Sequence, residues 1–363
     1  MSRKNVMPKY GFPVDTVEMR ANDSKNSLTL QRDLSIAISE YAPGSQVVAN
    51  GKLITSRYIR RVPKIGWKMY DYKKCECGAL NIDVSSTSTV IETCRVCGEA
   101  LRAAKQTFLV PEFGFAAEAK DKLPGLSRPE RTYRGEVSYV GQGSEADFVS
   151  QKIGGSVIKM DMTCGDEMAV LNESHFFVCD ICGYTELDEK DFTTCKEGRK
   201  HNNESGLKCA AERLRRYSLG YRFKTDVMQL LFMTHELPDM QTALSVLYAL
   251  LRGVSRRLDI ESSDISGCVQ RRRSGYALIL FDKTPGGAGH VRRLRENGVL
   301  QGVLEEALEL MQACTCGGEE GDSSCYACLR DYYNQKYHDI LNRGKAIRFI
   351  RALLSEEPAQ STE

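Results

Sequence analysis

Near its C-terminal end the chain reads Cys314-Thr315-Cys316 and, after eight residues, Cys325-Tyr326-Ala327-Cys328. These four thiols fall within fifteen residues. Closely spaced cysteine pairs are typical of a structural zinc site, because a tetrahedral zinc ion takes four soft ligands from short loops. The spacing is too tight for a hairpin between the two pairs. It therefore predicts a compact zinc knuckle, followed directly by a helix over residues 326–335.

Two further groups of cysteines repeat this pattern, so that twelve of the fourteen cysteines fall into three groups of four. In the first group, the segment between the pairs is rich in valine, serine and threonine and predicts the small hairpin of a zinc ribbon. In the second group, the fourth ligand is either Cys195 or His201. We expect three zinc ions, held by Cys75, Cys77, Cys94 and Cys97; by Cys179, Cys182, Cys195 (or His201) and Cys209; and by Cys314, Cys316, Cys325 and Cys328.

Disulfide bonds are the alternative use of so many cysteines, and they require an oxidising compartment. The N-terminal sequence Met-Ser-Arg-Lys-Asn has no apolar run of the kind that a secretory signal contains. No stretch approaches the roughly 18 apolar residues of a membrane span. The sequence therefore favours zinc over disulfides, in a cytoplasmic protein with no membrane partner.

Charge and length limit what the chain can be. Its 363 residues include 50 Lys and Arg against 48 Asp and Glu, a formal net charge of +2. No overall field draws such a protein to nucleic acid, so any binding of that kind has to come from local patches. The length predicts two to three domains.

The expected fold class is α+β, with a β-rich N-terminal half that contains zinc ribbons and a C-terminal α/β domain that ends in the four-cysteine knuckle and helices. Four divisions are predicted: an N-terminal helix and β-hairpin segment over 1–60, the first zinc ribbon over 61–110, a β-rich region with the second zinc site over 111–225, and the α/β zinc-binding domain over 226–363.

Hydrophobic periodicity predicts the main elements. In the N-terminal half we expect a helix over 30–41 and a hairpin over 46–54, with Asn50-Gly51 as its turn. Short strands are expected at 157–160 and 175–178, with Asp166 and Glu167 on the surface between them. The C-terminal part predicts helices over 240–258, 289–296, 300–311 and 340–354, and strands over 260–269 and 276–281.

A glycine-rich turn, Pro285-Gly286-Gly287-Ala288-Gly289-His290, follows the strand that ends at Asp282. Such turns can bind phosphate through free N–H groups. A metal-dependent nuclease or phosphoesterase using Asp282 and His290 is therefore one alternative. The simpler interpretation, which we favour, is that the glycines allow a tight crossover. The chain has no Gly-x-x-x-x-Gly-Lys-Ser/Thr phosphate loop, so we expect no ATP-driven motor and no catalytic residue in it.

Basic residues alternate with aromatic ones in one stretch and form two arginine clusters elsewhere. Aromatic rings beside phosphate-neutralising charges suit the binding of single-stranded nucleic acid. The alternative is a solvated strand edge whose aromatic residues belong to the core. The predicted nucleic-acid contacts are Arg60, Arg61, Lys64, Trp67, Lys68, Arg271, Arg272, Arg273, Arg292 and Arg293.

The run over residues 276–354 resembles the MrfA zinc-binding domain family, also called DUF1998. The resemblance is carried by Leu-Phe-Asp, by Pro-Gly-Gly-Ala-Gly-His, by Cys-Thr-Cys-Gly, by Ser-Ser-Cys-Tyr-Ala-Cys-Leu-Arg-Asp-Tyr-Tyr-Asn-Gln, and by His338-Asp339. Upstream, Tyr41-Ala42-Pro43-Gly44 and Asn50-Gly51-Lys52 resemble the segment that precedes this domain in the same proteins.

In that family the domain stands at the C-terminus of superfamily 2 DNA helicases, or in the separate helicase partner DrmB of the DISARM phage-defence system. The resemblance implies structural zinc at the last four cysteines and implies no catalytic residue. It implies an accessory subunit that assists DNA binding by a helicase supplied in trans, in phage defence or DNA repair. A purely structural adaptor that binds only protein is a further alternative.

Overall fold

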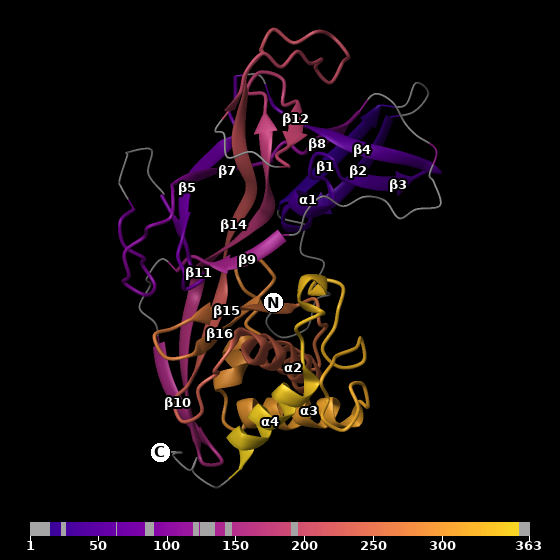
Figure 1. The fold of residues 1–363 in the computed structure, drawn as a ribbon. Helices are drawn as coiled ribbons and strands as arrows, with labels where there is room; N and C mark the ends of the chain where they lie inside the picture. Colours follow the sequence, from indigo (N-terminus) through magenta and orange to yellow (C-terminus); the bar gives the residue numbers. More distant parts are fainter. Residues whose placement is uncertain are drawn as a thin grey trace.

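Two long strands run the length of the molecule and connect its parts (Figure 1). They are β11 (Ser156–Val178) and β14 (Leu214–Phe232), which pair antiparallel. The computed structural model describes residues 15–22, 27–62, 64–83, 91–118, 123, 135–141, 147–189 and 195–355. Residues 1–14, at the start of the first predicted division, and 84–90, in the predicted hairpin of the first ribbon, lie outside these ranges.

The two short strands expected at 157–160 and 175–178 are the ends of this single strand β11. The prediction treated them as separate because polar residues at 163–167 and 172–175 interrupt the apolar pattern of β11. Its register with β14 shifts twice, between Thr163 and Asp166 and between Leu171 and His175. Such bulges bend a strand and interrupt the alternation of polar and apolar residues.

Asp166 and Glu167, expected on the surface, are buried beside the first of these bulges, at 3% and 2% exposure. Asp166 accepts a hydrogen bond from the Tyr139 hydroxyl, at 2.6 Å between the oxygens. Glu167 forms an ion pair with Arg222 of β14. Hydrogen bonds and ion pairs of this kind offset the free-energy cost of burying a carboxylate.

A five-stranded sheet forms the N-terminal part, in the order β2-β1-β8-β4-β3. The strands are β1 (Thr16–Asn22), β2 (Ser27–Asp33), β3 (Gln46–Ala49), β4 (Lys52–Ile59) and β8 (Phe115–Ala117), and the helix α1 (Leu34–Glu40) follows β2. The predicted hairpin is confirmed, with positive φ of 50° at Asn50 and 70° at Gly51. The predicted helix over 30–41 is half right, since its first residues continue β2 and pair with β1.

The larger sheet is built on β11 and β14 and has eleven strands among the described residues. On one side of β14 lie β7 (Gln106–Val110), β5 (Lys68–Lys74) and β6 (Leu80–Ile82); on the outer side of β11 lie β9 (Gly135–Tyr139) and β10 (Asp147–Ile153). The short strands β12 (Thr185–Leu187) and β13 (Cys195–Lys196) extend it at one end, and the hairpin of β15 (Ile265–Arg271) and β16 (Tyr276–Asp282) extends it at the other. The observed architecture is the expected α+β mixture.

Three helices cover the C-terminal end of this sheet (Figure 1). They are α2 (Met240–Leu258), α3 (Val299–Ala313) and α4 (Arg343–Leu354). Asp239 caps α2 by accepting the Thr242 N–H at 2.7 Å, and Asn342 caps α4 by accepting the Lys345 N–H at 2.8 Å. Side-chain caps satisfy N–H groups that a helix start leaves open. The same apolar core includes Cys328, so the last cysteine group is attached directly to these helices.

Two predicted helices of the C-terminal part are not α-helices. Residues 289–296 contain a 3₁₀ helix, η2 (Val291–Arg295), and residues 326–334 are turns and irregular backbone that precede η3 (Gln335–Tyr337). In the second case Asp331 Oδ1 accepts the N–H groups of Tyr333 and Asn334. A side chain that bonds to nearby backbone in this way competes with a helix.

Candidate metal centres and nucleic-acid surface

The first cysteine group lies at the ends of β5 and β6. The thiols of Cys75, Cys77, Cys94 and Cys97 all lie within 4.8 Å of one another. The Sγ–Sγ distance is 3.5 Å for Cys75–Cys97 and 3.8 Å for Cys77–Cys94. Sulfur atoms around a tetrahedral zinc ion, at Zn–S about 2.3 Å, are about 3.8 Å apart. The spacing therefore fits zinc and is far too long for a disulfide bond.

The surroundings of this group favour thiolate. The Cys77 thiol, hydrogen-bonded to Cys94, lowers the pKa of Cys94 to about 4. The Asn81 side-chain amide also donates to Cys94 Sγ, at 3.4 Å. Metal ligation requires the thiolate form, and a donor outside the ligand set fixes the orientation of a ligand.

In the second group the structure brings His201, and not Cys195, to the other three ligands. A ring nitrogen of His201 and the thiols of Cys179, Cys182 and Cys209 lie within 4.8 Å of one another. Cys195 lies outside this set, on β13, where its sulfur accepts a hydrogen bond from Arg213 at 3.6 Å. Of the two open alternatives for the fourth ligand, the geometry favours the histidine.

The imidazole of His201 is held in a position that suits a metal ligand. Its Nδ1 lies 2.9 Å from the Arg199 carbonyl oxygen, so this nitrogen donates a proton there. Nε2 is buried and has no hydrogen-bond partner among the described residues. The ring stacks on Tyr184 with centroids 4.7 Å apart. A fixed donor on one nitrogen and a free lone pair on the other are typical of a zinc-bound histidine.

The third group forms the predicted knuckle. Sγ–Sγ distances are 3.5 Å for Cys314–Cys325, 3.6 Å for Cys316–Cys328 and 3.8 Å for Cys325–Cys328, again the spacing of a tetrathiolate zinc site.

Arg343, at the start of α4, holds this knuckle and was missed by the sequence analysis. Its guanidinium is buried and donates to the carbonyl oxygens of Cys316 (2.9 and 3.0 Å), Met311 (3.0 Å) and Gly318 (2.8 Å). No spacing rule identifies an arginine that binds only backbone. In the sequence, Arg343 is seen only as a charged residue at the start of a predicted helix.

The glycine turn is closed by a side chain of the protein itself. Asp282 is fully buried, and its carboxylate accepts the N–H groups of Ala288 (2.7 Å), His290 (3.0 Å) and Val291 (3.0 Å). These are the N–H groups that a bound phosphate would need. The geometry therefore favours a structural crossover over a phosphate or catalytic site at Asp282 and His290.

The stretch of predicted nucleic-acid contacts over 60–68 lies against the second metal group. Trp67 is only 8% exposed, and its indole N–H donates to the Arg60 carbonyl oxygen at 2.8 Å, so this ring belongs to the core. Arg61 donates to the carbonyl oxygen of Asp180, between Cys179 and Cys182. Lys64 is exposed, whereas Lys68 forms an ion pair with Glu112 at 2.7 Å.

The two arginine clusters lie at opposite ends of the β15–β16 hairpin. Arg271 pairs with Tyr276 next to the turn, whereas Arg292 follows the far end of β16. A seven-residue strand is about 20 Å long, so the clusters do not form one patch. Several of these arginines also have partners within the protein. Arg273 and Arg292 form ion pairs with Glu99 and Asp226, and Arg272 and Arg293 donate hydrogen bonds to the Gln229 side chain and the Leu258 carbonyl oxygen.

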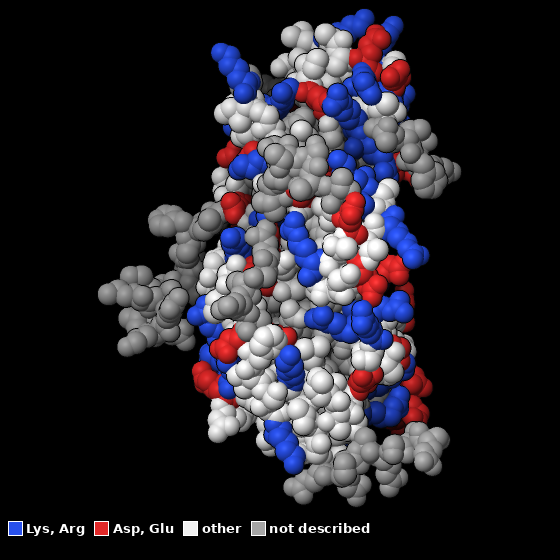
Figure 2. All heavy atoms as spheres, turned by 90° about the vertical axis from the view of Figure 1, so that its left-hand side faces the viewer, with Lys and Arg blue, Asp and Glu red and all other residues white. Residues whose placement is uncertain are grey.

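Positive charge gathers instead around the second metal group. We use the name basic end for residues 57–62, 64–68, 179–189 and 195–216, which carry twelve Lys and Arg against seven Asp and Glu. The whole chain has nearly equal numbers of both. Figure 2 shows basic side chains along one face of the molecule, with a run of them toward its upper end. The local excess is what a polyanion-binding patch requires.

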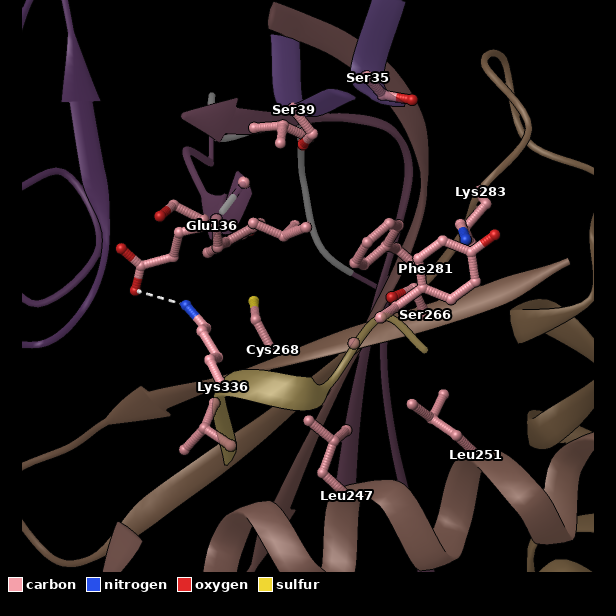
Figure 3. A pocket seen from close by; sticks show the side chains of 18 of the residues that line it. Ser35, Ser39, Glu136, Leu247, Leu251, Ser266, Cys268, Phe281, Lys283 and Lys336 are labelled. Atoms are coloured by element: carbon pink, nitrogen blue, oxygen red, sulfur yellow. Dashed lines mark ion pairs between the residues drawn. The ribbon is translucent and has the colours of Figure 1, made fainter. Parts of the chain in front are cut away.

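A cavity of about 1390 Å³ lies where the N-terminal part meets the C-terminal helices (Figure 3). Ser35 and Ser39 of α1 line it from one side, and Leu247 and Leu251 of α2 from the other. Glu136 and Lys336 form an ion pair across it at 4.0 Å. Burial lowers the pKa of Lys283, which also lines this cavity. Acidic and basic residues both line it, so its charge selects no single class of ligand.

Comparison with known proteins assigns part of the chain. Residues 246–329, which include all four cysteines of the third group, match the family model described as the MrfA Zn-binding domain. Over these residues the chain is similar to the MrfA Zn-binding domain. The third group, α3 and most of α2 lie within the matched range. The first two groups lie outside the matched range.

Relatives of the chain are distant. The Druantia protein DruE of Escherichia coli (strain UMEA 4076-1) is 24% identical over 402 residues, which cover 96% of this chain and 21% of DruE. The chain thus spans about a fifth of the length of this relative.

Two solved structures of the DUF1998 helicase MrfA also match, at 11% identity. For the structure bound to DNA the TM-score is 0.43, and the alignment covers 93% of this chain and 33% of MrfA. For the other structure the TM-score is 0.38, and the alignment covers 94% of this chain and 34% of MrfA. These scores are too low to transfer fold or function. Among the described helices, none is both long and apolar enough to cross a membrane.

Proposed function

We propose that this chain is a zinc-bearing, DNA-binding accessory unit of a superfamily 2 helicase, which acts in trans in a phage-defence or DNA-repair complex. It has no catalytic residue of its own in this proposal. Each of the three metal groups holds one zinc ion, the second through Cys179, Cys182, His201 and Cys209. The match to the MrfA Zn-binding domain supports association with a helicase, and the resemblance to DrmB supports a DISARM-like role.

The observation that carries the DNA-binding proposal is the set of unpaired cations at the basic end. Arg61, Lys64, Lys200, Lys208 and Arg213 are exposed, and none has a carboxylate within ion-pair distance among the described residues. Exposed cations without acidic partners are free to neutralise phosphates.

The metal group fixes the backbone that carries these cations. Lys200 and Lys208 are the direct neighbours of His201 and Cys209. The two ligands are joined by the hydrogen bond from Cys209 N–H to the His201 carbonyl oxygen at 3.0 Å. A bound zinc ion would therefore hold both lysines in a defined arrangement, which lowers the entropy lost when they meet phosphates.

A salt titration of DNA binding tests this proposal. The triple variant Lys64→Ala, Lys200→Ala, Lys208→Ala should bind duplex DNA more weakly, and the slope of log affinity against log salt should fall by up to about three units, since each lost phosphate contact removes roughly 0.9. The matched control is Lys152→Ala, Lys224→Ala, Arg351→Ala, which removes three exposed cations outside the basic end. Equal slopes for both variants and the unaltered protein would contradict the proposal.

A protein-binding adaptor is the second candidate, and the same end of the molecule favours it through exposed apolar side chains. Ile65, Ile181 and Leu207 are 54%, 60% and 67% exposed. Exposed apolar groups that cluster often mark protein interfaces. If the chain is a protein-binding adaptor, the substitutions Ile181→Ser and Leu207→Ser should abolish its association with a helicase in a pull-down. The unaltered chain should then show no salt-dependent DNA binding. The nuclease alternative has no such support, because Asp282 is bound by its own turn.

A further inference from the structure

Three exposed tyrosines lie beside the third metal group. Tyr326, Tyr332 and Tyr333 are 62%, 47% and 65% exposed, and they fall within eight residues of sequence. We call them the tyrosine surface. Aromatic rings of this size are usually buried for the most part, so three exposed rings close together indicate a contact surface. Trp67, the aromatic contact predicted from the sequence, has a buried ring.

The backbone under the tyrosine surface is held firmly. Asn334 is fully buried, and its amide donates to the Leu329 carbonyl oxygen at 2.8 Å. His338 Nε2 lies 2.9 Å from Asn334 Oδ1. The His338 ring meets the Tyr326 ring edge-on, with their centroids 5.4 Å apart. A fixed backbone presents aromatic rings at a low entropy cost on binding.

Two arginines without carboxylate partners contact the segment that carries these rings. Arg252 donates to the carbonyl oxygens of Tyr326 (3.2 Å) and Arg330 (2.9 Å). Arg330 donates to Ser324 Oγ (2.9 Å) and to the His338 carbonyl oxygen (3.1 Å). Neither arginine has an ion-pair partner among the described residues, so no carboxylate neutralises the charge of either one. The acid of this segment, Asp331, is occupied by backbone N–H groups.

Lys283 adds a third cation. Its ammonium lies 4.3 Å from the centroid of the Tyr333 ring, and it has no carboxylate within ion-pair distance in the described ranges. Lys283, Tyr332 and Tyr333 also line the cavity between the two parts of the molecule, where Figure 3 shows Lys283. Rings next to unneutralised cations match the pattern of single-strand binding sites, in which bases stack and phosphates are neutralised.

We propose that the tyrosine surface binds unpaired bases of single-stranded DNA by stacking, with Arg252, Lys283 and Arg330 beside the phosphates. This inference rests on the proposed DNA-binding function and specifies which strand form is held. Duplex DNA hides the faces of its bases in its own stack, so it cannot use these rings. Stacking requires no particular base, so binding should be tolerant of sequence.

Substitution of the tyrosines tests this inference in the full chain. Tyr332→Leu with Tyr333→Leu should weaken binding to single-stranded oligothymidine by at least about tenfold, the scale of one lost base stack. Affinity for duplex DNA and the salt slope should stay unchanged, because no phosphate contact is removed. Tyr332→Phe with Tyr333→Phe should retain binding, since the rings remain. An oligonucleotide containing 2-aminopurine should lose fluorescence on binding the unaltered protein and not on binding the leucine variant.

Zinc content and unfolding temperature show whether each variant is folded, and Tyr326→Leu gives an independent measurement at the same surface. An equal loss for single-stranded and duplex DNA, or no loss for either, would overturn the inference. So would a leucine variant that binds DNA normally but no longer associates with a helicase, because the surface would then dock protein. If the unaltered chain binds no DNA, the proposed function fails as well; if it binds with full salt dependence and the leucine variant equals it, only this inference fails.

Discussion

At the scale of single residues, the choice between Cys195 and His201 depends on a short hairpin that the spacing of ligands does not reveal. Asn202 pairs with Lys208, and this pairing brings His201 next to Cys209. Cysteine spacing could identify three ligands of the second group, but it could not choose the fourth, because both candidates lie between Cys182 and Cys209. The deciding observation is the buried Nε2 of His201.

Substitution of the two candidates should separate them. His201→Ala should lower the zinc content from three ions per chain to about two, because three thiolates without a fourth ligand bind zinc far more weakly. Cys195→Ala should leave three ions bound. Elemental analysis after gel filtration measures both. Loss of one zinc ion from the cysteine variant, with none from the histidine variant, would assign the ligand to Cys195 instead.

Buried ionic residues were the hardest to foresee. Asp166, Glu167, Asp282 and Arg343 are all buried, and each has partners that are far away in sequence or are backbone groups. Composition and periodicity assign charged residues to the surface, which is the usual outcome. Only the fold shows which of them have enough partners to be buried.

At the scale of elements, the helix α2 was predicted at the limits that the structure gives, 240–258, since its apolar residues recur at helical spacing and Asp239 caps it. The segment 326–335 shows where such reasoning fails. It contains good helix formers, yet Asp331 directs the backbone into turns. Local hydrogen bonds of this kind depend on conformation, and periodicity does not report them.

Contact between α2 and α3 depends on a glycine. A Cβ at Gly253 would lie 2.4 Å from the Val303 carbonyl oxygen, a backbone atom that cannot yield easily. Gly253→Ala should therefore lower the free energy of unfolding by about 1–3 kcal/mol, despite alanine's higher helix propensity. Urea denaturation measures this change.

Gly302 of α3 is the matched control. A Cβ there would meet the side chain of Arg257, at 2.6 Å from Nε, and a long side chain can move aside. Gly302→Ala should be neutral or stabilising by up to about 1 kcal/mol. If Gly302→Ala destabilises the protein more than Gly253→Ala does, the close approach of α2 to the backbone of α3 is not what fixes their packing.

At the scale of the whole molecule, β11 and β14 form a frame that runs through the structure (Figure 1), and the three metal groups lie in segments far apart in the sequence. The second lies at the basic end, and the third lies beside the tyrosine surface, within the residues that match the MrfA Zn-binding domain. The existence of the groups could be predicted from spacing alone. Their positions could not, because they depend on which strands pair across more than a hundred residues of sequence.

The central claim is that zinc ions hold the backbone that presents cations to DNA. The most direct test is the affinity of the full chain for DNA at low salt, measured before zinc removal, after removal with a chelator, and after zinc is restored. We predict salt-dependent binding that is lost or greatly weakened on removal and recovered on restoration, because lysines next to released ligands lose their fixed arrangement. Zinc-free protein that binds DNA as tightly, with the same salt slope, would contradict the account.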